Sequence, residues 1–306
     1  MRKMKQEQNK SKFYFDWTDK SSGFFYALKE IIISKKSNYQ QIDLVVLEEV
    51  GLTLILDGKV QIAELDEFIY HEVITHIPAI TVGKVENVLI VGGGDGCALR
   101  EILKYDTLKR CVLVDIDRDV VEISKEYLNH INRGAFFDPR VEVIFEDGRK
   151  FLERTSEKFD VIIIDTVDPL EYGPSYLLFT KEFMEVVKSR LEDNGIVAIQ
   201  SNTIFLGGSK FLLAMYKTLE RVFPKVSFAW TYLKSFMLSW AFTFGCKGRT
   251  PEEVPYEEIE KVLKKIDTRY LTPEVFRACI AKPKFFIEDI KKFEEIITDS
   301  NPVFVY

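Results

Sequence analysis

Four acidic side chains stand at or just beyond the ends of short apolar stretches in the central part of the chain: Asp95, Asp115, Asp147 and Asp165. In an open α/β sheet, ligands bind outside the carboxyl ends of the parallel strands. Carboxylates gathered at one edge repel one another unless a cation or hydrogen-bond donors meet them. The pattern therefore predicts a site for a ligand that carries hydroxyl groups, amines or a fixed positive charge.

The first of these acids belongs to the stretch VLIVGGGDG, residues 88–96. Glycines have no Cβ, so the backbone N–H groups of a turn that contains Gly92 and Gly94 can approach a ligand closely. Asp115 comes 20 residues after Asp95, about where a dinucleotide-binding unit places the acid that holds ribose hydroxyls. Together they indicate an adenosine-bearing ligand; the alternative is a tight turn and a solvated Asp115.

A second group of acids lies in the stretch DTVDPLEYGPSYLLFT, residues 165–180. Asp165, Asp168 and Glu171 stand close together there beside two tyrosines, and the prolines exclude a regular helix. Carboxylates bind ammonium groups, and aromatic faces attract cations. The stretch is therefore predicted to be a loop that binds a flexible polycation; the alternative is a solvated acidic surface loop.

The elements that must position these acids alternate between strand and helix. Apolar stretches predict strands at residues 88–91, 111–115, 141–147, 159–165 and 195–200. Two more strands, at 226–233 and 240–248, are joined by the short connection KSFMLS and must pair antiparallel. The fold class is α/β: a Rossmann-like, class I methyltransferase-like sheet, mostly parallel, with an antiparallel hairpin near its end.

The preceding part of the chain predicts a small β unit. Residues 42–64 alternate as strands around the turn at Asp57–Gly58, a strong hairpin signal. We predict an N-terminal β-strand domain with its linking helix over residues 1–78. A Rossmann-like catalytic domain with a helical tail is predicted over residues 79–306.

The linking helix carries Tyr70 and His71 close to the first strand of the sheet. Its apolar residues recur at helical spacing, which predicts that it packs the β unit onto the larger domain. From position alone, Tyr70 is best interpreted as a packed aromatic side chain and His71 as a capped or solvated imidazole.

Composition narrows the class of protein. The chain has 306 residues, is 46% hydrophobic and 29% charged, and carries a net charge of −6, which argues against a nucleic-acid partner. No apolar run follows the basic first residues, so neither a secretory signal peptide nor a membrane-spanning segment is expected there. We therefore predict a cytoplasmic protein with no membrane partner.

The cysteines show no CxxC spacing and the three histidines show no HExxH motif, so no metal is expected. Cys97 and Cys111 are predicted to be buried thiols.

Several stretches together resemble the polyamine aminopropyltransferases, the spermidine synthase family, over residues 38–247: LDGKVQIAELDEFIYHE, VLIVGGGDG, VDID, EDG and DTVDP. Members of this family transfer an aminopropyl group from decarboxylated S-adenosylmethionine to an amine and release 5′-methylthioadenosine. The resemblance implies this co-substrate, no tightly bound cofactor, small polyamine substrates and a homodimer or homotetramer.

The resemblance also implies roles for individual residues. Asp165 is the expected catalytic residue, which accepts a proton or hydrogen bond from the attacking amine. Asp95 is expected to bind the aminopropyl ammonium. The remaining expected donor contacts are Gln40, Gly92, Gly94, Asp115, Ile116, Asp147, Gly148 and Pro174. The remaining expected acceptor contacts are Tyr70, His71, Asp168, Glu171, Phe236 and Trp240.

The chain departs from simple spermidine synthases in the loop that carries Glu171, which is longer, and near the last hairpin, where Phe236 and Trp240 stand in place of a tyrosine. These features resemble thermospermine synthases and enzymes that aminopropylate agmatine, so spermidine or agmatine is favoured over putrescine. The alternatives are a spermidine synthase acting on putrescine, an S-adenosylmethionine-dependent methyltransferase, an NAD-dependent dehydrogenase and a non-enzymatic polyamine-binding protein.

Overall fold

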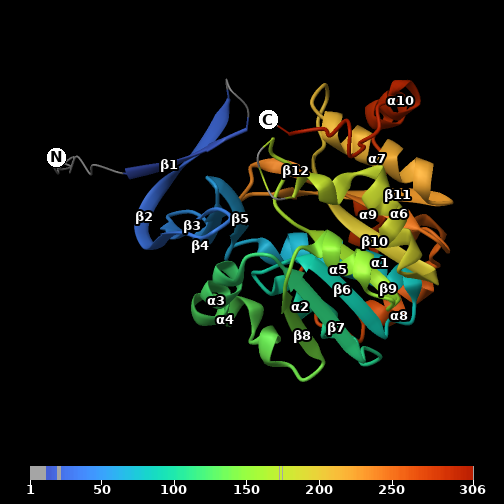
Figure 1. Ribbon diagram of the computed structural model, residues 1–306, viewed down its shortest axis with the longest axis horizontal. Helices are drawn as coiled ribbons and strands as arrows, with labels where there is room; N and C mark the ends of the chain where they lie inside the picture. The colour runs from blue at the N-terminus through green and yellow to red at the C-terminus, as the bar shows by residue number, and fades with distance from the viewer. Residues whose placement is uncertain (1–11, 19–21, 172, 174, 306) are drawn as a thin grey trace, which may run out of the picture. The chain divides into compact units, whose positions relative to one another are not determined.

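The computed structural model describes residues 12–18, 22–171, 173 and 175–305. The chain forms two compact units that divide between Leu65 and Asp66 (Figure 1). Helix α1 (Glu67–Val82) therefore belongs to the second unit, whereas the sequence predicted a boundary after residue 78. The physical reason is burial: apolar side chains of α1 share a core with the strands and helices that follow it.

The first unit is a five-stranded antiparallel sheet in the order β1-β2-β3-β4-β5. Its strands are β1 (Lys12–Trp17), β2 (Gly23–Lys36), β3 (Gln41–Leu47), β4 (Gly51–Leu56) and β5 (Lys59–Ala63). The predicted hairpin at Asp57–Gly58 is confirmed, because it joins β4 to β5 and both residues have positive φ. The strands β1 and β2 were not predicted, because most of their side chains are exposed and few pack into the core.

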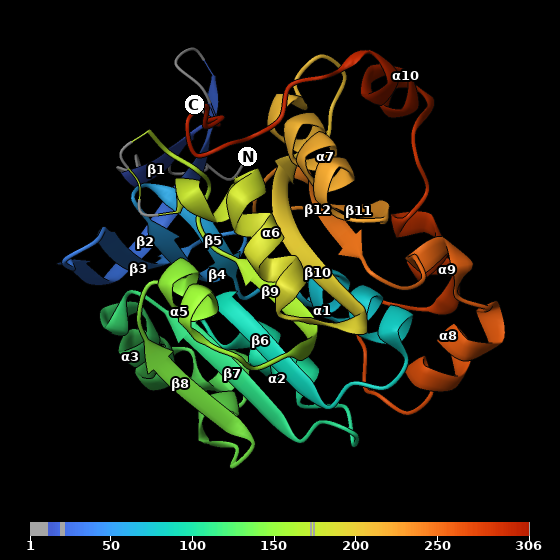
Figure 2. The same cartoon turned by 45° about the vertical axis from the view of Figure 1, so that its right-hand side comes forward.

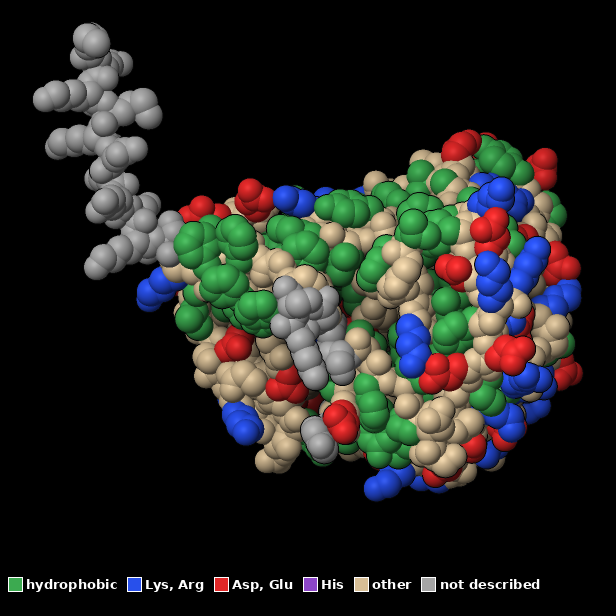
Figure 3. Space-filling model, turned by 90° about the horizontal axis from the view of Figure 1, so that it is seen from above, with side chains coloured by type: hydrophobic (Ala, Val, Ile, Leu, Met, Phe, Trp, Pro, Cys, Tyr) green, Lys and Arg blue, Asp and Glu red, His purple; other side chains and the backbone are tan. Residues whose placement is uncertain are grey.

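Those aromatic side chains form an apolar face on the β1–β2 hairpin. Phe13, Phe15, Trp17 and Phe25 are each between 48% and 63% exposed, and their rings contact one another. Hydrophobic side chains gather on the face seen in Figure 3. Exposed apolar patches of this kind mark surfaces that contact another molecule.

The second unit is built on a seven-stranded sheet in the order β11-β12-β10-β9-β6-β7-β8. Its strands are β6 (Asn87–Gly92), β7 (Arg110–Asp115), β8 (Val141–Phe145), β9 (Phe159–Asp165), β10 (Leu191–Thr203), β11 (Lys225–Leu233) and β12 (Leu238–Cys246). The five strands from β10 to β8 are parallel, and β12 pairs antiparallel with both β10 and β11. The predicted Rossmann-like fold with its antiparallel hairpin is confirmed.

Helices cover both faces of this sheet (Figure 2). One face packs against α1, α2 (Cys97–Ile102), α3 (Arg118–Tyr127), α8 (Tyr256–Leu263) and α9 (Pro273–Cys279). The other packs against α5 (Gly148–Arg154), α6 (Lys181–Ser189) and α7 (Lys210–Val222). The short α4 (Asn129–Asn132) follows α3, and α10 (Lys284–Lys292) adds Phe286 to a smaller apolar cluster with α7.

The register of the strands brings the four predicted acids to one edge. Gly92 pairs with Asp165 and Asp115 pairs with Phe145, so the carboxyl ends of β9, β6, β7 and β8 lie side by side. Gly92 has φ +81°, and a Cβ there would lie 2.2 Å from the carbonyl oxygen of Asp165. The turn after β6 therefore rests directly against the end of β9, and only glycine fits that position.

Cys97 and Cys111 are buried free thiols, as predicted, and so are the other two cysteines. In the part of the chain that the structure describes, every helix is either too short or too polar to cross a lipid bilayer. Residues 1–11, which contain the basic segment used to predict location, lie outside the described residues.

Candidate active site

Helix α1 and the ends of β6 and β9 bring four of the predicted residues together. The hydroxyl of Tyr70 donates a hydrogen bond of 2.6 Å to Oδ1 of Asp165. The Nε2 atom of His71 lies 3.5 Å from Oδ1 of Asp95 and 4.0 Å from Oδ2 of Asp165. Tyr70 is thus a packed aromatic, as its position suggested, but its hydroxyl and the imidazole of His71 also face the acids.

The electrostatics of this group differ from those of a surface cluster. Burial raises the pKa of the Asp165 carboxyl, and the charge of His71 opposes that rise. Burial lowers the pKa of His71, but Asp95 and a hydrogen bond with Glu67 raise it to about 9, so the ring is charged at neutral pH. Oδ2 of Asp165 is buried and accepts no hydrogen bond from the described residues. A buried carboxylate oxygen of this kind fits an incoming N–H donor such as an amine.

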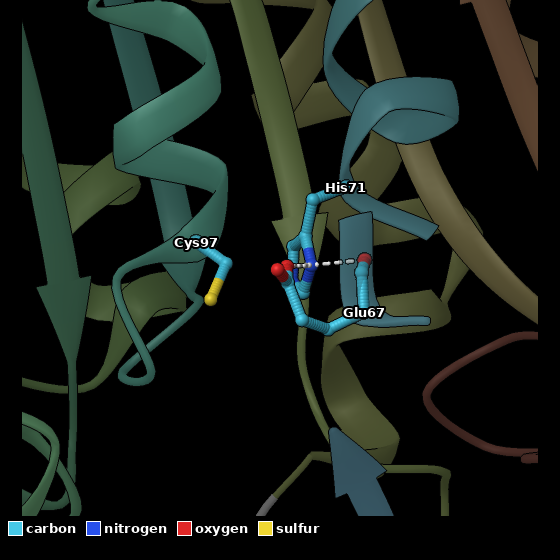
Figure 4. A group of neighbouring side chains, drawn as sticks. All are labelled: Glu67, His71 and Cys97. Carbon is cyan, nitrogen blue, oxygen red and sulfur yellow. Dashed lines mark hydrogen bonds and ion pairs between the residues drawn. The ribbon is translucent and has the colours of Figure 1, made fainter. Parts of the chain in front are cut away.

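Two residues behind His71 were not predicted. Glu67 stands four positions before His71 on α1, and its backbone and carboxylate oxygens lie 2.7 and 3.1 Å from Nδ1 (Figure 4). Arg100 of α2 donates two hydrogen bonds to the Glu67 carboxylate. The spacing of Glu67 and His71 on one helix face was a usable signal, whereas nothing in the sequence linked Arg100 to them.

Ligand atoms of Glu67, His71 and Cys97 lie within 4.8 Å of one another, close enough for a metal ion to be considered. Hydrogen bonds lower the pKa of the Glu67 carboxyl to about 2 despite its burial, and they come from His71 and Arg100. Its two oxygens are therefore already paired with cationic groups, which favours a hydrogen-bonded ion cluster. The absence of a metal requirement stays a prediction.

Asp168 is oriented by two amide side chains from the end of β10. Nε2 of Gln200 donates to Oδ1 at 3.2 Å, and Nδ2 of Asn202 donates to Oδ2 at 2.8 Å. Neither amide was predicted to have a role, although Gln200 ends a predicted strand at the carboxyl edge of the sheet. Glu171 is exposed on the same loop as Asp168, so its contact with an acceptor remains a prediction.

Phe236 and Trp240 extend an aromatic wall from Tyr70. The ring of Phe236 lies 6.2 Å from that of Tyr70 and 4.9 Å from that of Trp240, both edge-on. The turn before Phe236 is fixed because the backbone N–H of Ser235 donates to Asp66, the residue that precedes α1. These two predicted residues are therefore connected to Asp165 through Tyr70, and an aromatic face of this kind can attract a cationic chain.

The predicted ribose contact, Asp115, is the last residue of β7. Oδ1 of Asp115 accepts from the backbone N–H of Asp117 at 2.8 Å, and burial raises the pKa of the Asp115 carboxyl to about 7. A Cβ on Gly94 would lie 2.7 Å from Oδ2 of Asp115, so the glycine turn touches this carboxylate. Ile116 is partly buried beside it.

The predicted adenine contacts follow β8. Asp147 caps α5, because its Oδ1 accepts from the backbone N–H groups of Arg149 and Lys150. Gly148 is buried, and a Cβ there would meet a methyl group of β6. Gln40 lies in the first unit, between β2 and β3, and Pro174 lies outside the described residues. Contacts of Gln40 and Pro174 with a nucleoside stay predictions.

A segment from the end of the second unit reaches the loop that carries Asp168. We call residues 297–305 the strap; its Ile297 and Val303 are buried in the core. The backbone N–H of Val305 donates to the carbonyl of Pro169 at 3.2 Å, and the ring of Phe304 lies 6.0 Å from that of Tyr176. The strap therefore supports the loop at both of its ends.

Replacing Val305 by proline, which removes the N–H donor to Pro169, is expected to raise KM for the amine acceptor about fivefold, since one such hydrogen bond contributes about 1 kcal/mol. KM for the donor is expected to change less, because the predicted donor contacts other than Pro174 lie outside this loop. Steady-state kinetics with each substrate varied in turn measures both. Val305→Ala keeps the N–H and is the control; equal effects of the two variants would contradict the assignment.

Two family models match most of the chain. A family model described as the spermine/spermidine synthase domain matches residues 67–256. The chain belongs to the spermine/spermidine synthase family. A second model, described as the spermidine synthase tetramerisation domain, matches residues 13–64, which is the described sheet of the first unit.

Relatives cover nearly the whole chain. A polyamine aminopropyltransferase from Sulfurisphaera tokodaii is 38% identical over 296 residues, which is 96% of this chain and 98% of that protein. One from a Thermoanaerobacter species is 38% identical over 279 residues, 91% of this chain and 97% of that protein. The predicted enzyme class, polyamine aminopropyltransferase, is confirmed.

Solved structures confirm the fold. The crystal structure of spermidine synthase from Thermotoga maritima matches with a TM-score of 0.84 and 30% identity, over 96% of this chain and 98% of that chain. A spermidine synthase in complex with the transition-state analogue AdoDATO matches with the same values. The methyltransferase, dehydrogenase and non-enzymatic alternatives are set aside by this family membership.

Proposed function

We propose that this protein transfers the aminopropyl group of decarboxylated S-adenosylmethionine to a polyamine or related amine and releases 5′-methylthioadenosine. The observation that carries the proposal is Asp165, a buried carboxylate with one oxygen held by Tyr70 and the other without a hydrogen-bond donor among the described residues. Asp95 stands next to it, and both carboxylates face Nε2 of His71. A similar spermidine synthase was solved in complex with the transition-state analogue AdoDATO, which supports a transfer reaction.

Asp165 and Asp95 have different roles in the proposed substitution reaction. The amine nitrogen attacks the carbon bonded to the sulfonium, the C–N bond forms as the C–S bond breaks, and the sulfur leaves as a neutral thioether. Free amines are mostly protonated at pH 7, so the bound amine must lose a proton, which passes to Asp165. Asp95 holds the ammonium of the aminopropyl group. Because a carboxylate is a weak base, alignment of the two substrates supplies much of the rate.

Asp115 makes donor-side binding depend on pH. With a pKa raised to about 7 by burial, its carboxyl is largely protonated at pH 6 and ionised at pH 8, and two ribose hydroxyls need the ionised form. The affinity for 5′-methylthioadenosine is expected to rise about tenfold over this interval, measured by calorimetry at both values. Asp115→Asn is expected to bind weakly with no such rise; a wild-type affinity that is flat with pH would refute the role.

For the acceptor, we favour spermidine or agmatine over putrescine. The support is the aromatic wall of Phe236 and Trp240 and the acids of the loop after β9, which suit a cation with a charge further along its chain. The test is product analysis with decarboxylated S-adenosylmethionine and putrescine, agmatine, spermidine or cadaverine. The highest kcat/KM with spermidine or agmatine supports the proposal, and the highest with putrescine makes the enzyme a spermidine synthase.

Glu171→Gln is expected to raise KM for the long acceptor several-fold and to change KM for putrescine less, because Glu171 is exposed and can reach a distal charge that putrescine lacks. The measurement is steady-state kinetics with both amines. Glu288→Gln removes another exposed acid, on α10, and serves as the control. A parallel change for both acceptors would show that Glu171 does not sense length.

We also propose that the protein forms a homodimer or homotetramer through the apolar face of the β1–β2 hairpin. Four exposed aromatic side chains lie on that hairpin, and the matched family model there is described as a tetramerisation domain. Sedimentation velocity tests this, and a monomer across the working concentration range would refute it. A cytoplasmic location is likewise a proposal, consistent with small polyamine substrates.

A further inference from the structure

The carboxylate of Glu67 contacts Nδ1 of His71 (Figure 4), whereas Asp165 faces the other ring nitrogen, Nε2. Both Glu67 oxygens are held by Arg100, at 2.7 Å from Nη1 and 2.9 Å from Nη2. Arg100 is itself fixed by the carboxylate of Glu101 and the carbonyl of Ile131. All these side chains are buried, so the geometry of the pair is set by the fold rather than by solvent.

The partners of His71 decide its protonation. Nδ1 meets the carbonyl and carboxylate oxygens of Glu67, which accept hydrogen bonds and cannot donate them, so Nδ1 carries a proton. Nε2 faces carboxylate oxygens of Asp95 and Asp165, so a proton there is favoured as well. The ring is therefore an imidazolium with a hydrogen at each nitrogen, in agreement with its raised pKa.

The charged and titratable groups that face His71 come from each element packed against it: Glu67 and Tyr70 of α1, Asp95 after β6, Cys97 and Arg100 of α2 through Glu67, and Asp165 of β9. The three carboxylates favour the charged ring. Glu67 differs from the other two because it contacts Nδ1, whereas they face Nε2.

We propose that Glu67, clamped by Arg100, is a positioning residue that keeps His71 as a fixed cation beside the attacking amine and so favours the neutral, nucleophilic form of that amine. This rests on the proposed aminopropyl transfer. A positive charge near a bound amine lowers the pKa of that amine. The imidazolium takes no proton itself, because both ring nitrogens are already protonated, and the proton of the amine passes to Asp165.

The sign of the effect gives a test that a purely structural role does not share. If His71 loses its charge, the pKa of the bound amine rises, and the increase of kcat with pH moves to higher pH. At neutral pH kcat therefore falls. In alkaline solution the amine loses its proton without help from His71, and kcat returns to its wild-type value. A distorted site would lose kcat at every pH.

The experiment is the kcat–pH profile of Glu67→Gln. The amide can still bond to His71 and Arg100 but carries no charge. The rise of kcat is expected to move up by about one pH unit, which lowers kcat about tenfold near pH 7.5 and restores it near pH 10. Because the single substitution leaves the buried Arg100 cation with Glu101 as its remaining carboxylate partner among the described residues, the double variant Glu67→Gln, Arg100→Gln is measured beside it, and the same shift is expected.

A matched control and a double-mutant cycle distinguish the proposed effect of the His71 charge from an effect of altered packing. Glu72 is a buried carboxylate on the same helix, and it accepts hydrogen bonds from the backbone N–H groups of residues 269–271. Glu72→Gln is expected to leave the position of the rise unchanged. In a His71→Gln background, Glu67→Gln is expected to cause no further shift, because Glu67 acts through His71. A further shift in that background would overturn the proposal.

Histidine titration followed by NMR gives a readout that needs no turnover. The pKa of His71, assigned with His71→Gln, is expected to fall by about two units or more in Glu67→Gln, from about 9 in the wild type, so that the ring is mostly neutral near pH 7.5. An unchanged His71 titration and an unchanged kcat–pH profile overturn the positioning role while aminopropyl transfer stands. Absence of turnover by the wild-type enzyme with every acceptor overturns the proposed function, and with it the role of Glu67.

Discussion

Replacing Asp165 by asparagine is expected to lower kcat by about 10²- to 10⁴-fold, the range that loss of a general base usually costs. Asparagine has the same shape, and its carbonyl oxygen can still accept the 2.6 Å hydrogen bond from Tyr70. It cannot take the proton of the attacking amine. Single-turnover kinetics with decarboxylated S-adenosylmethionine, together with the affinity for 5′-methylthioadenosine, separates a chemical defect from a binding defect.

The matched control for this variant is Asp160→Asn, on the same strand. Oδ2 of Asp160 accepts two backbone hydrogen bonds at the opposite end of β9, from Glu86 and Asn87. Its loss is expected to reduce thermal stability and to leave kcat within a few-fold of wild type. If Asp165→Asn also turned over at nearly the wild-type rate, Asp165 would have no part in the proton transfer.

The second large effect is expected on the choice of donor. The carboxylate of ordinary S-adenosylmethionine would face the carboxylate of Asp95 and be repelled, whereas the decarboxylated donor offers an ammonium alone. Asp95→Asn is expected to lower kcat/KM for the decarboxylated donor by about 10- to 100-fold, the usual worth of one hydrogen bond to a charged group. Discrimination against S-adenosylmethionine should fall by a similar factor.

Competition between the two donors, followed by binding assays with each, measures that discrimination. Asp95 is well placed for this role because the backbone around it is fixed: its Oδ1 accepts from the N–H of Cys97, and its carbonyl accepts from the side chain of Asn132. Asp168→Asn is the comparison, since it alters the acceptor side and should leave donor choice unchanged. If Asp95→Asn distinguished the two donors as well as the wild type does, residues other than Asp95 would be responsible for the donor selectivity.

The pH dependence of these variants follows from burial. Asp165 has a raised pKa, so its basic form is lost at a higher pH than for an exposed aspartate as the solution is acidified. His71 has a pKa raised to about 9, so its charge is complete below its ordinary pKa near 6.5 and is lost as pH rises through about 9. The stability that the charged ring contributes is lost over the same interval.

Local patterns in the sequence were sufficient to predict the parallel strands of the sheet and the edge at which the four acids lie. Apolar stretches that end in Asp or Gly predicted β6, β7, β8 and β9, because strand burial and turn chemistry depend on neighbours in the chain. Parallel pairing then places their carboxyl ends side by side. The same reasoning predicted the hairpin at Asp57–Gly58, where the turn residues alone fix the geometry.

The tertiary structure decided what depends on partners far apart in the chain. Tyr70 bonds to Asp165 across 95 positions, Arg100 to Glu67 across 33, and Asn202 to Asp168 across 34. No local periodicity specifies which buried donor meets which acceptor, because that choice follows from how α1, α2 and the sheet pack. Strands β1 and β2 were not predicted for a related reason: most of their side chains, including four aromatic ones, are exposed on a surface instead of packing into a core.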